Sequence, residues 1–188
     1  MGTICGHSID EYISMIKDFH GHLAPGLLIG GFMVDLATKN MPTGEFFDAL
    51  CETATCLPDA VQILTPCTYG NGWLKVVNVG RFALAFFEKY TGAGIRVHLD
   101  AMKLDKYPEI RNWFLKLKTK QEQDKDRLIH EILTAESRII GMTPVQLVEE
   151  LIGKMKSGKI FLCPGCGEAY PMKDGDRCLA CQGTHLYR

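Results

Sequence analysis

The chain has 188 residues, a formal net charge of −1 and a hydrophobic fraction of 46%. This length suits one domain, or one domain with a small appendage, and a near-zero charge gives no overall attraction to nucleic acid or to an anionic membrane. No run of 18 apolar residues is present, and the first residues lack the basic and apolar regions of a secretory signal. We therefore expect a cytoplasmic protein without a membrane anchor.

The first forty residues predict two helices. A capping box at residues 8–11 starts the first helix, and Gly21 ends it. Pro25 suits the first turn of a second helix that runs to about residue 40. Gly26 and Gly30 lie one turn apart in that helix, and each costs about 1 kcal/mol relative to alanine. We expect them to allow close approach of a ligand or of another backbone, with a second protomer as one source.

The middle of the chain predicts an antiparallel sheet. A short helix over 58–64 carries Cys56 at its N-terminus, and the Gly/Asn/Pro loop that follows holds Cys67. Together with the early helices, this pattern indicates an α+β fold. The predicted strands are the segments rich in β-branched and aromatic residues at 45–53, 73–79, 81–90 and 95–99.

Polar helices are predicted after Pro108. One covers residues 113–118, and an amphipathic stripe at 128–133 indicates the next. A second capping box at residues 143–146, with proline at the first helical position, predicts a helix to about residue 156. The predicted domains are an α+β core over 1–158, whose helical extension covers about 107–157, and a small domain over 159–188.

The small domain carries two CxxC pairs. Two such pairs deliver four thiolates to one ion, and a closed set of four is typical of structural zinc. The order, with the second pair opening the last segment, resembles a treble-clef finger. Two redox pairs or disulfides are the alternative, and His185 is a spare ligand that we regard as a bystander. The predicted zinc ligands are Cys163, Cys166, Cys178 and Cys181.

A second candidate site lies in the core. His20 and His22 flank the predicted helix end, and Cys56 stands at a helix N-terminus, where the dipole favours thiolate. With Cys67, these residues form a ligand set typical of zinc or of a redox metal. We predict a second metal, of unknown identity, bound more weakly than the finger zinc. Two alternatives remain: a helix-capping histidine with small core cysteines, or a Cys/His nucleophile pair.

Three segments, taken in order, resemble the FmdE/FwdE family of formylmethanofuran dehydrogenase subunits. The resemblance covers about residues 10–100, and some family members also carry a four-cysteine finger. It implies an α+β core, an intertwined homodimer, and a site around the His-Gly-His motif that takes in the later cysteines, Asp59 and Gln62. The segments are FHGHLAPGLLIG, CLPDAVQILTPCTYGNG and VGRFALAFFEKYTGAGIRV.

One position departs from the family pattern. Ala24 stands where the family motif His-Gly-His-x-Cys-Pro-Gly has cysteine, so one thiol is missing. This departure favours a site with two histidines and one or two cysteines, or a site that has lost its original activity.

The resemblance implies a methanogenesis-related setting, in which the named complex reduces carbon dioxide onto methanofuran. The sequence itself shows no pterin, iron–sulfur or formyl-transfer motif. Our first hypothesis is an accessory protein that binds, senses or delivers a metal, or associates with a redox complex. The second is an enzyme with a mononuclear His/Cys site. The third is a regulator whose finger contacts nucleic acid or a protein partner.

Overall fold

The computed structural model describes residues 2–41, 47–153, 158–184 and 187. Contacts divide the chain into two compact units, residues 1–153 and 154–188, and each unit is described by itself. The boundary expected from the sequence, after residue 158, falls slightly later. Among the helices of the described residues, none combines the length and the apolar character that crossing a bilayer demands.

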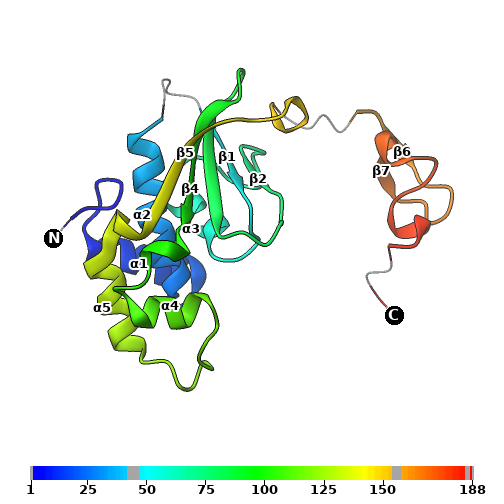
Figure 1. The fold of residues 1–188 in the computed structure, drawn as a ribbon. Coiled ribbons are helices and arrows are strands. Elements are labelled where there is room, and N and C mark those ends of the chain that lie inside the picture. Colours follow the sequence, from blue (N-terminus) through cyan, green and yellow to red (C-terminus); the bar gives the residue numbers. More distant parts are fainter. Residues whose placement is uncertain (1, 42–46, 154–157, 185–186, 188) are drawn as a thin grey trace. The chain divides into compact units, whose positions relative to one another are not determined.

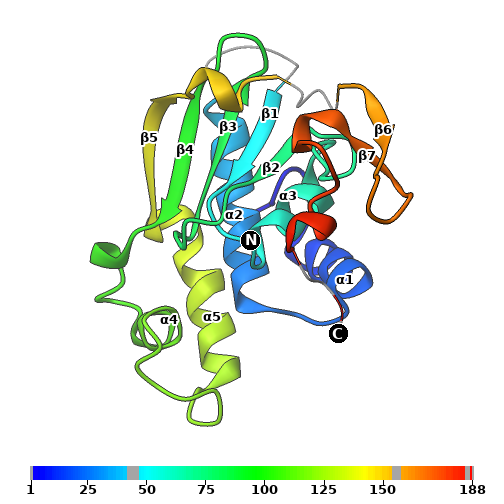
Figure 2. The same ribbon diagram turned by 90° about the vertical axis from the view of Figure 1, so that its right-hand side faces the viewer.

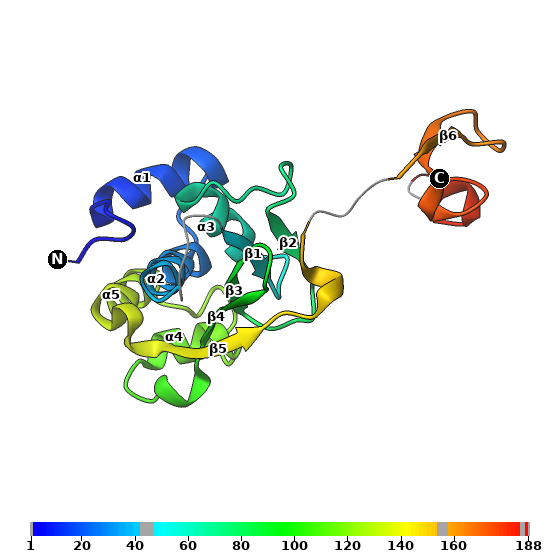
Figure 3. The same ribbon diagram turned by 90° about the horizontal axis from the view of Figure 1, so that it is seen from above.

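The first unit is a five-stranded sheet with helices packed on one face (Figure 1). The strand order is β2-β1-β3-β4-β5, and Figure 2 shows these strands side by side. Figure 3 shows α1, α2 and α3 on the same side of the sheet. The helices are α1 (Ile9–His20), α2 (Pro25–Lys39), α3 (Leu57–Leu64), α4 (Pro108–Phe114) and α5 (Lys125–Ala135). The strands are β1 (Phe47–Cys51), β2 (Leu74–Val76), β3 (Ala83–Glu88), β4 (Ala93–Leu99) and β5 (Ile140–Gln146).

The main core lies between the sheet and the helices. Successive side chains of a strand point to opposite faces, so alternate residues of β3 enter different clusters. Leu84 and Phe86 join the main core, whereas Ala85 and Phe87 face the other way and form a smaller cluster with Leu50. This two-sided burial explains why β3 reads as a continuous apolar run.

The α+β fold is confirmed, with one exception to the antiparallel pattern. β1 pairs with β3 in the antiparallel sense, but it pairs with β2 in the parallel sense. The two strands run the same way because the chain crosses over through α3 between them. The predicted strands at 73–79 and 81–90 are shorter in the structure, and residues 45 and 46 of the predicted first strand lie outside the described residues.

The predicted helix over 144–156 is wrong. Residues Ile140–Gln146 form β5, which pairs antiparallel with β4, and a short 3₁₀ turn follows at Glu149–Leu151. A capping box is a local signal, and here pairing with a distant strand overrides it. Pro144 is compatible with a strand because β5 is at the edge of the sheet. Residues 154–156 of the predicted helix lie outside the described residues.

The predicted helix after Pro108 is confirmed, but its bounds differ from 113–118, because α4 begins at Pro108 and ends at Phe114. Lys116 takes a left-handed φ of 54°, and the amide of Leu117 donates to the carbonyl of Asn112 at 2.9 Å. A left-handed residue at this point terminates a helix. The chain then forms a loop that reaches α5.

The glycines of α2 allow neighbouring helices to approach. A Cβ at Gly30 would lie 2.8 Å from the Cβ of Ala60 in α3. A Cβ at Gly26 would lie 2.8 Å from the Sγ of Cys56, which immediately precedes α3. The predicted close approach is therefore confirmed, and the approaching segment belongs to the same chain.

The second unit is a two-stranded hairpin followed by short turns. β6 (Ile160–Leu162) pairs antiparallel with β7 (Ala169–Pro171), and the knuckle between them holds the first cysteine pair. Short 3₁₀ turns cover Met172–Asp174 and Ala180–Gln182, and the latter contains Cys181. His185 lies outside the described residues.

Candidate functional site

His20 is held by a carboxylate from a different helix. It is the last residue of α1, and its Nδ1 lies 2.7 Å from Oδ2 of Asp59, in the first turn of α3. Both side chains are partly exposed, at 25% and 30% of their full areas. When Nδ1 donates to the carboxylate, the lone pair of Nε2 is available to a ligand. The pair therefore fixes the orientation of the imidazole.

The two histidines come together where α1 ends. Gly21 takes a left-handed φ of 88° and caps α1, which breaks the helix between them. The ring centroids of His20 and His22 are 4.8 Å apart. A regular helix points residues i and i+2 in different directions, so this helix end is what brings the two rings together.

His22 and Cys56 line one pocket of about 900 Å³, together with the first turn of α2. Ala24, the position where the family pattern has cysteine, lines the same pocket. A cysteine at that position would therefore stand on the wall that His22 and Cys56 share. The family motif and the later cysteine thus belong to one surface of this protein.

Cys56 is not biased toward thiolate, contrary to the sequence-based expectation. Burial raises the pKa of its thiol, and the nearby Asp59 carboxylate raises it further. The residue also has a left-handed φ of 58°, which is rare for a residue with a side chain. The thiol is therefore the stable form unless a cation is bound.

Cys67 and Gln62, both expected in the core site, instead make structural contacts. Cys67 is fully buried, its Sγ donates to the carbonyl of Phe47 at 3.4 Å, and it is not part of the pocket lining. Burial raises the pKa of Cys67 to about 11. The Gln62 side chain accepts from the amide of Tyr69 and so holds the following loop. The structure therefore places the rings of His20 and His22 side by side, bonds His20 to Asp59, and puts His22 and Cys56 in the lining of one pocket. As they stand, these side chains are not grouped closely enough to share an ion.

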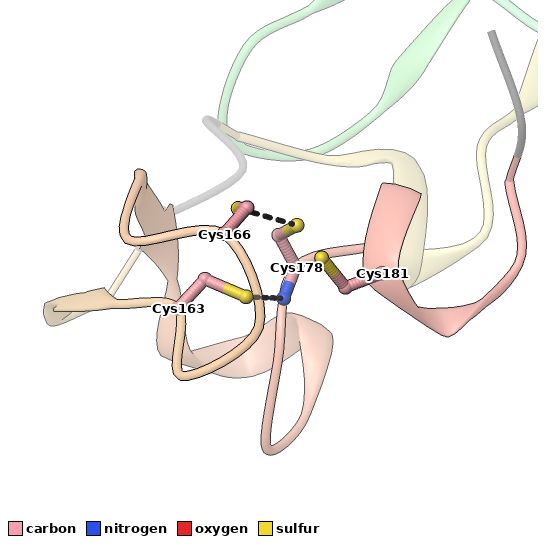
Figure 4. Close-up of side chains that lie close together, drawn as sticks. All are labelled: Cys163, Cys166, Cys178 and Cys181. Carbon is pink, nitrogen blue, oxygen red and sulfur yellow. Dashed lines mark hydrogen bonds between the residues drawn. The ribbon is translucent and has the colours of Figure 1, made fainter. Parts of the chain in front are cut away.

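The four finger cysteines form a site that fits zinc (Figure 4). Their sulfur atoms all lie within 4.8 Å of one another, and Cys166 and Cys178 are 3.8 Å apart. A tetrahedral ion with Zn–S bonds of about 2.3 Å requires neighbouring sulfurs about 3.8 Å apart. Across the described residues, this is the one group of three or more His, Cys, Asp or Glu side chains close enough to share an ion.

The hydrogen bonds and charges of the finger also favour a bound cation. The amides of Cys178 and Gly165 both donate to the Sγ of Cys163 at 3.4 Å. These donors lower the pKa of Cys163 to about 6, whereas the neighbouring thiols, Cys178 first, raise the pKa of Cys181 to about 12. Four adjacent thiolates repel one another, and a divalent ion removes that repulsion. The cluster supports a closed structural zinc site, as predicted from the two CxxC pairs.

The remaining residues that line the core pocket could not be identified from a motif in the sequence. They come from Trp113 in α4, from the loop over 115–124 and from the start of α5. In the sequence this loop is only a charged connection between helices. No local motif marks it, because its place in the pocket lining with His22 depends on how α4 packs against α5 and how α5 packs against α2.

Two family models match the chain. The model described as "FmdE, Molybdenum formylmethanofuran dehydrogenase operon" matches residues 19–149. The model described as "FmdE treble clef zinc finger" matches residues 154–188.

Two known proteins are similar to the chain. The first is a crystal structure from Syntrophus aciditrophicus, described as an FmdE-like protein of the tungsten formylmethanofuran dehydrogenase type. It is 53% identical, covers 100% of both chains and superposes with a TM-score of 0.90. The second is a curated protein of Archaeoglobus fulgidus, named a probable S-adenosyl-L-methionine-binding protein, which is 28% identical over 190 residues. That match covers 90% of this chain and 52% of the relative, so the chain spans about half the relative's length.

The FmdE model covers more than half of the chain, and it includes both histidines and Cys56. The finger model covers all four clustered cysteines. The chain therefore belongs to the FmdE family and carries that family's treble-clef zinc finger at its C-terminal end.

Proposed function

We propose that the protein is a metal-binding accessory protein whose core binds one metal ion at His20 and His22, with Cys56 drawn in from the pocket lining as the third ligand. The three side chains are not close enough to share an ion as they stand, so binding would require them to shift toward one another. The observation that carries this proposal is the 2.7 Å contact between His20 Nδ1 and Asp59. Histidines that ligate metals usually donate their other ring N–H to a carboxylate, which orients the ring and makes it a stronger ligand.

Three protein ligands leave a position for water or for a substrate, unlike the closed finger site. Cys56 would enter the site as a thiolate, because a bound cation lowers the pKa of a coordinating thiol. A site of this kind suits a protein that senses or delivers a metal, or that assists a redox complex. The same open position would also serve a mononuclear enzyme, which is the alternative function.

The test is a titration of the full-length protein with zinc, nickel and ferrous ions at neutral pH. We expect a second ion per chain beyond the finger zinc, and His22→Ala should remove it. Asp59→Asn should weaken it by about 10- to 100-fold, because the carboxylate orients His20. His130→Ala is the matched control, since His130 is exposed on α5 and outside the pocket lining. Equal metal content in wild type and His22→Ala would refute the core site.

A second candidate function is binding of S-adenosyl-L-methionine, which the name of the Archaeoglobus relative suggests for that protein. The pocket of about 900 Å³ is large enough for a ligand of this size. Calorimetric titration of the full-length chain with S-adenosyl-L-methionine tests it directly. The absence of binding in the presence and in the absence of added metal would rule it out.

We also propose that the chain forms a homodimer, as the family resemblance implies. The glycines of α2 do not contribute to this argument, because α3 of the same chain occupies the space beside them. Sedimentation at several concentrations tests the dimer, and a concentration-independent monomer would contradict it. The finger as a nucleic-acid contact is tested by binding to random duplex DNA at two salt concentrations.

A further inference from the structure

The lining of the core pocket includes a cluster of lysines, here called the basic rim. Four lysines make it up: Lys116, Lys118, Lys120 and Lys125. Lys118 is engaged elsewhere, since its Nζ lies 3.0 Å from Oε1 of Glu109. Within the described part of the chain, no ion pair is recorded for the other three lysines.

The acidic groups of the pocket offset this charge in part. Glu122 accepts from the amide and the hydroxyl of Thr119, at 2.9 and 2.7 Å, so it is used to fold the loop. Asp126 lies in the first turn of α5, where the positive end of the helix balances a carboxylate. The rim is therefore cationic where Lys116, Lys120 and Lys125 stand.

The loop that carries these lysines is ordered by hydrogen bonds along its length. The amide of Leu117 donates to Asn112 at one end, and the amide of Arg127 donates to the Asp124 side chain at the other. In between, the Gln123 side chain donates to the carbonyl of Lys118 at 3.2 Å. These bonds fix the backbone of the loop that carries the lysines, so the loop need not be ordered anew when a ligand binds.

The lining of the same pocket also includes apolar side chains. Leu128 is buried, Trp113 and Ile129 are half-buried, and Leu117 is 56% exposed although it lines the pocket. An exposed leucine beside an indole and aliphatic side chains favours a ligand with an apolar portion. The lining of the pocket thus combines apolar side chains, the basic rim, and His22 with Cys56.

We propose that this pocket binds an organic anion: a small molecule with an apolar body and a carboxylate or phosphate group that the lysines neutralise. The inference rests on the proposed function in one respect, namely that the ligand would lie beside the core metal site. Anion binding itself needs no metal, so the two can be tested separately. The ligand's apolar body would contact Trp113 and Leu128.

The experiment uses Trp113 as the reporter. The chain has two tryptophans, and Trp73→Phe leaves Trp113 as the sole one. 4-Nitrobenzoate and 4-nitrophenyl phosphate are the anionic probes, and 4-nitrobenzyl alcohol is the neutral probe of matched shape. Nitroaromatic groups quench an indole at short range, so saturable quenching reports a ligand held against Trp113.

We expect saturable quenching by at least one anion and at least fivefold weaker binding of the neutral probe. The stronger of the two anions identifies the preferred group, carboxylate or phosphate. Binding should weaken as sodium chloride is raised, because exposed charges are screened. Lys120→Glu with Lys125→Glu should weaken the anion at least tenfold, since each exposed ion pair contributes about two- to fivefold and both charges are reversed.

The matched control reverses two exposed lysines outside the pocket, Lys106→Glu with Lys159→Glu, and should leave the affinity within twofold. The Lys125→Glu change leaves α5 intact because a carboxylate is favourable in the first turn of a helix. Both double variants should keep the metal content of wild type. If quenching is linear for all probes, or if the rim and control variants bind the anions equally, the anion pocket is refuted. A missing core metal with intact anion binding would instead refute the proposed function alone.

Discussion

Gly26→Ala tests how tightly α2 approaches α3 at the core site. The added Cβ would lie 2.8 Å from Sγ and 3.0 Å from Cβ of Cys56, and 3.5 Å from the Phe82 ring. The first two distances are shorter than van der Waals contact, so either the start of α3 or the start of α2 must shift. Overpacking of this kind costs about 1–3 kcal/mol. A central value of about 2 kcal/mol would lower the Tm of a chain of this size by roughly 4–8 °C.

The assay is urea unfolding followed by tryptophan fluorescence. Both tryptophans, Trp73 and Trp113, lie in the first unit, so the signal follows the core and not the finger. The same variant should bind the core metal more weakly, because the thiol of Cys56 is displaced in the pocket that it shares with His22.

Cys56→Gly provides the compensating change. It removes both clashing atoms, and glycine suits the left-handed φ of 58° at this position. Alone it should be close to neutral, because relief of backbone strain, about 1 kcal/mol, offsets the lost contacts of a partly buried thiol. Combined with Gly26→Ala, it should recover at least about 1 kcal/mol as a coupling free energy. An unchanged urea midpoint for Gly26→Ala, or a coupling of zero, would refute the close-packing argument.

Three further predictions concern the finger, a buried ion pair and the core metal. Cys178→Ser should release the finger zinc and unfold the second unit while the tryptophan-detected unfolding of the first unit stays the same; retained zinc with a folded hairpin would contradict this. Glu52→Gln should lower the free energy of unfolding by about 2 kcal/mol at pH 7, because the Glu52 carboxylate bonds Arg96 at 2.6 and 2.9 Å and also bonds Arg81. The Arg96 guanidinium lowers the pKa of Glu52. This stabilisation is therefore fully present above the ordinary carboxyl pKa near 4.5, and it is lost as the pH falls through the lowered pKa. A wild-type advantage in unfolding free energy that persists unchanged at acidic pH would contradict this prediction. The core metal should bind more weakly at acidic pH, because protons compete with a metal ion for imidazole ligands, so equal calorimetric affinity at pH 7.5 and 5.5 would refute histidine ligation.

Local signals in the sequence predicted local structure well. The capping box at residues 8–11 is confirmed, since the Ser8 hydroxyl accepts from the amide of Glu11 and the Glu11 carboxylate accepts from the amide of Ser8. All of its partners lie within one turn. The two CxxC pairs succeeded for the same reason, because each knuckle is set by its own few residues.

The failures arose where distant segments decide the outcome. Residues 143–146 match the same capping-box pattern, but that segment pairs with β4 and completes the sheet. Gly141 in the same strand leaves room for the ring of His98. In the core site, the histidine pair was visible from its motif, whereas the exclusion of Cys67 from the pocket follows from its bond to Phe47. The lysine rim was hidden because its position depends on the left-handed turn at Lys116.

The pairing of β4 with β5 has an evolutionary consequence. Leu99 and Ile140 are register partners, and the amide of Asp100 donates to the carbonyl of Ile139 at 2.9 Å. Residues 100–139 therefore leave the sheet and return to it at a single point, and they carry Trp113, the lysine rim and the start of α5. An excursion whose ends already meet can change in length and composition at a modest cost in loop-closure entropy. Natural variation, or grafting in the laboratory, could thus replace this segment as a unit and change the ligand preference of the pocket, while His22 in the same pocket stays in place.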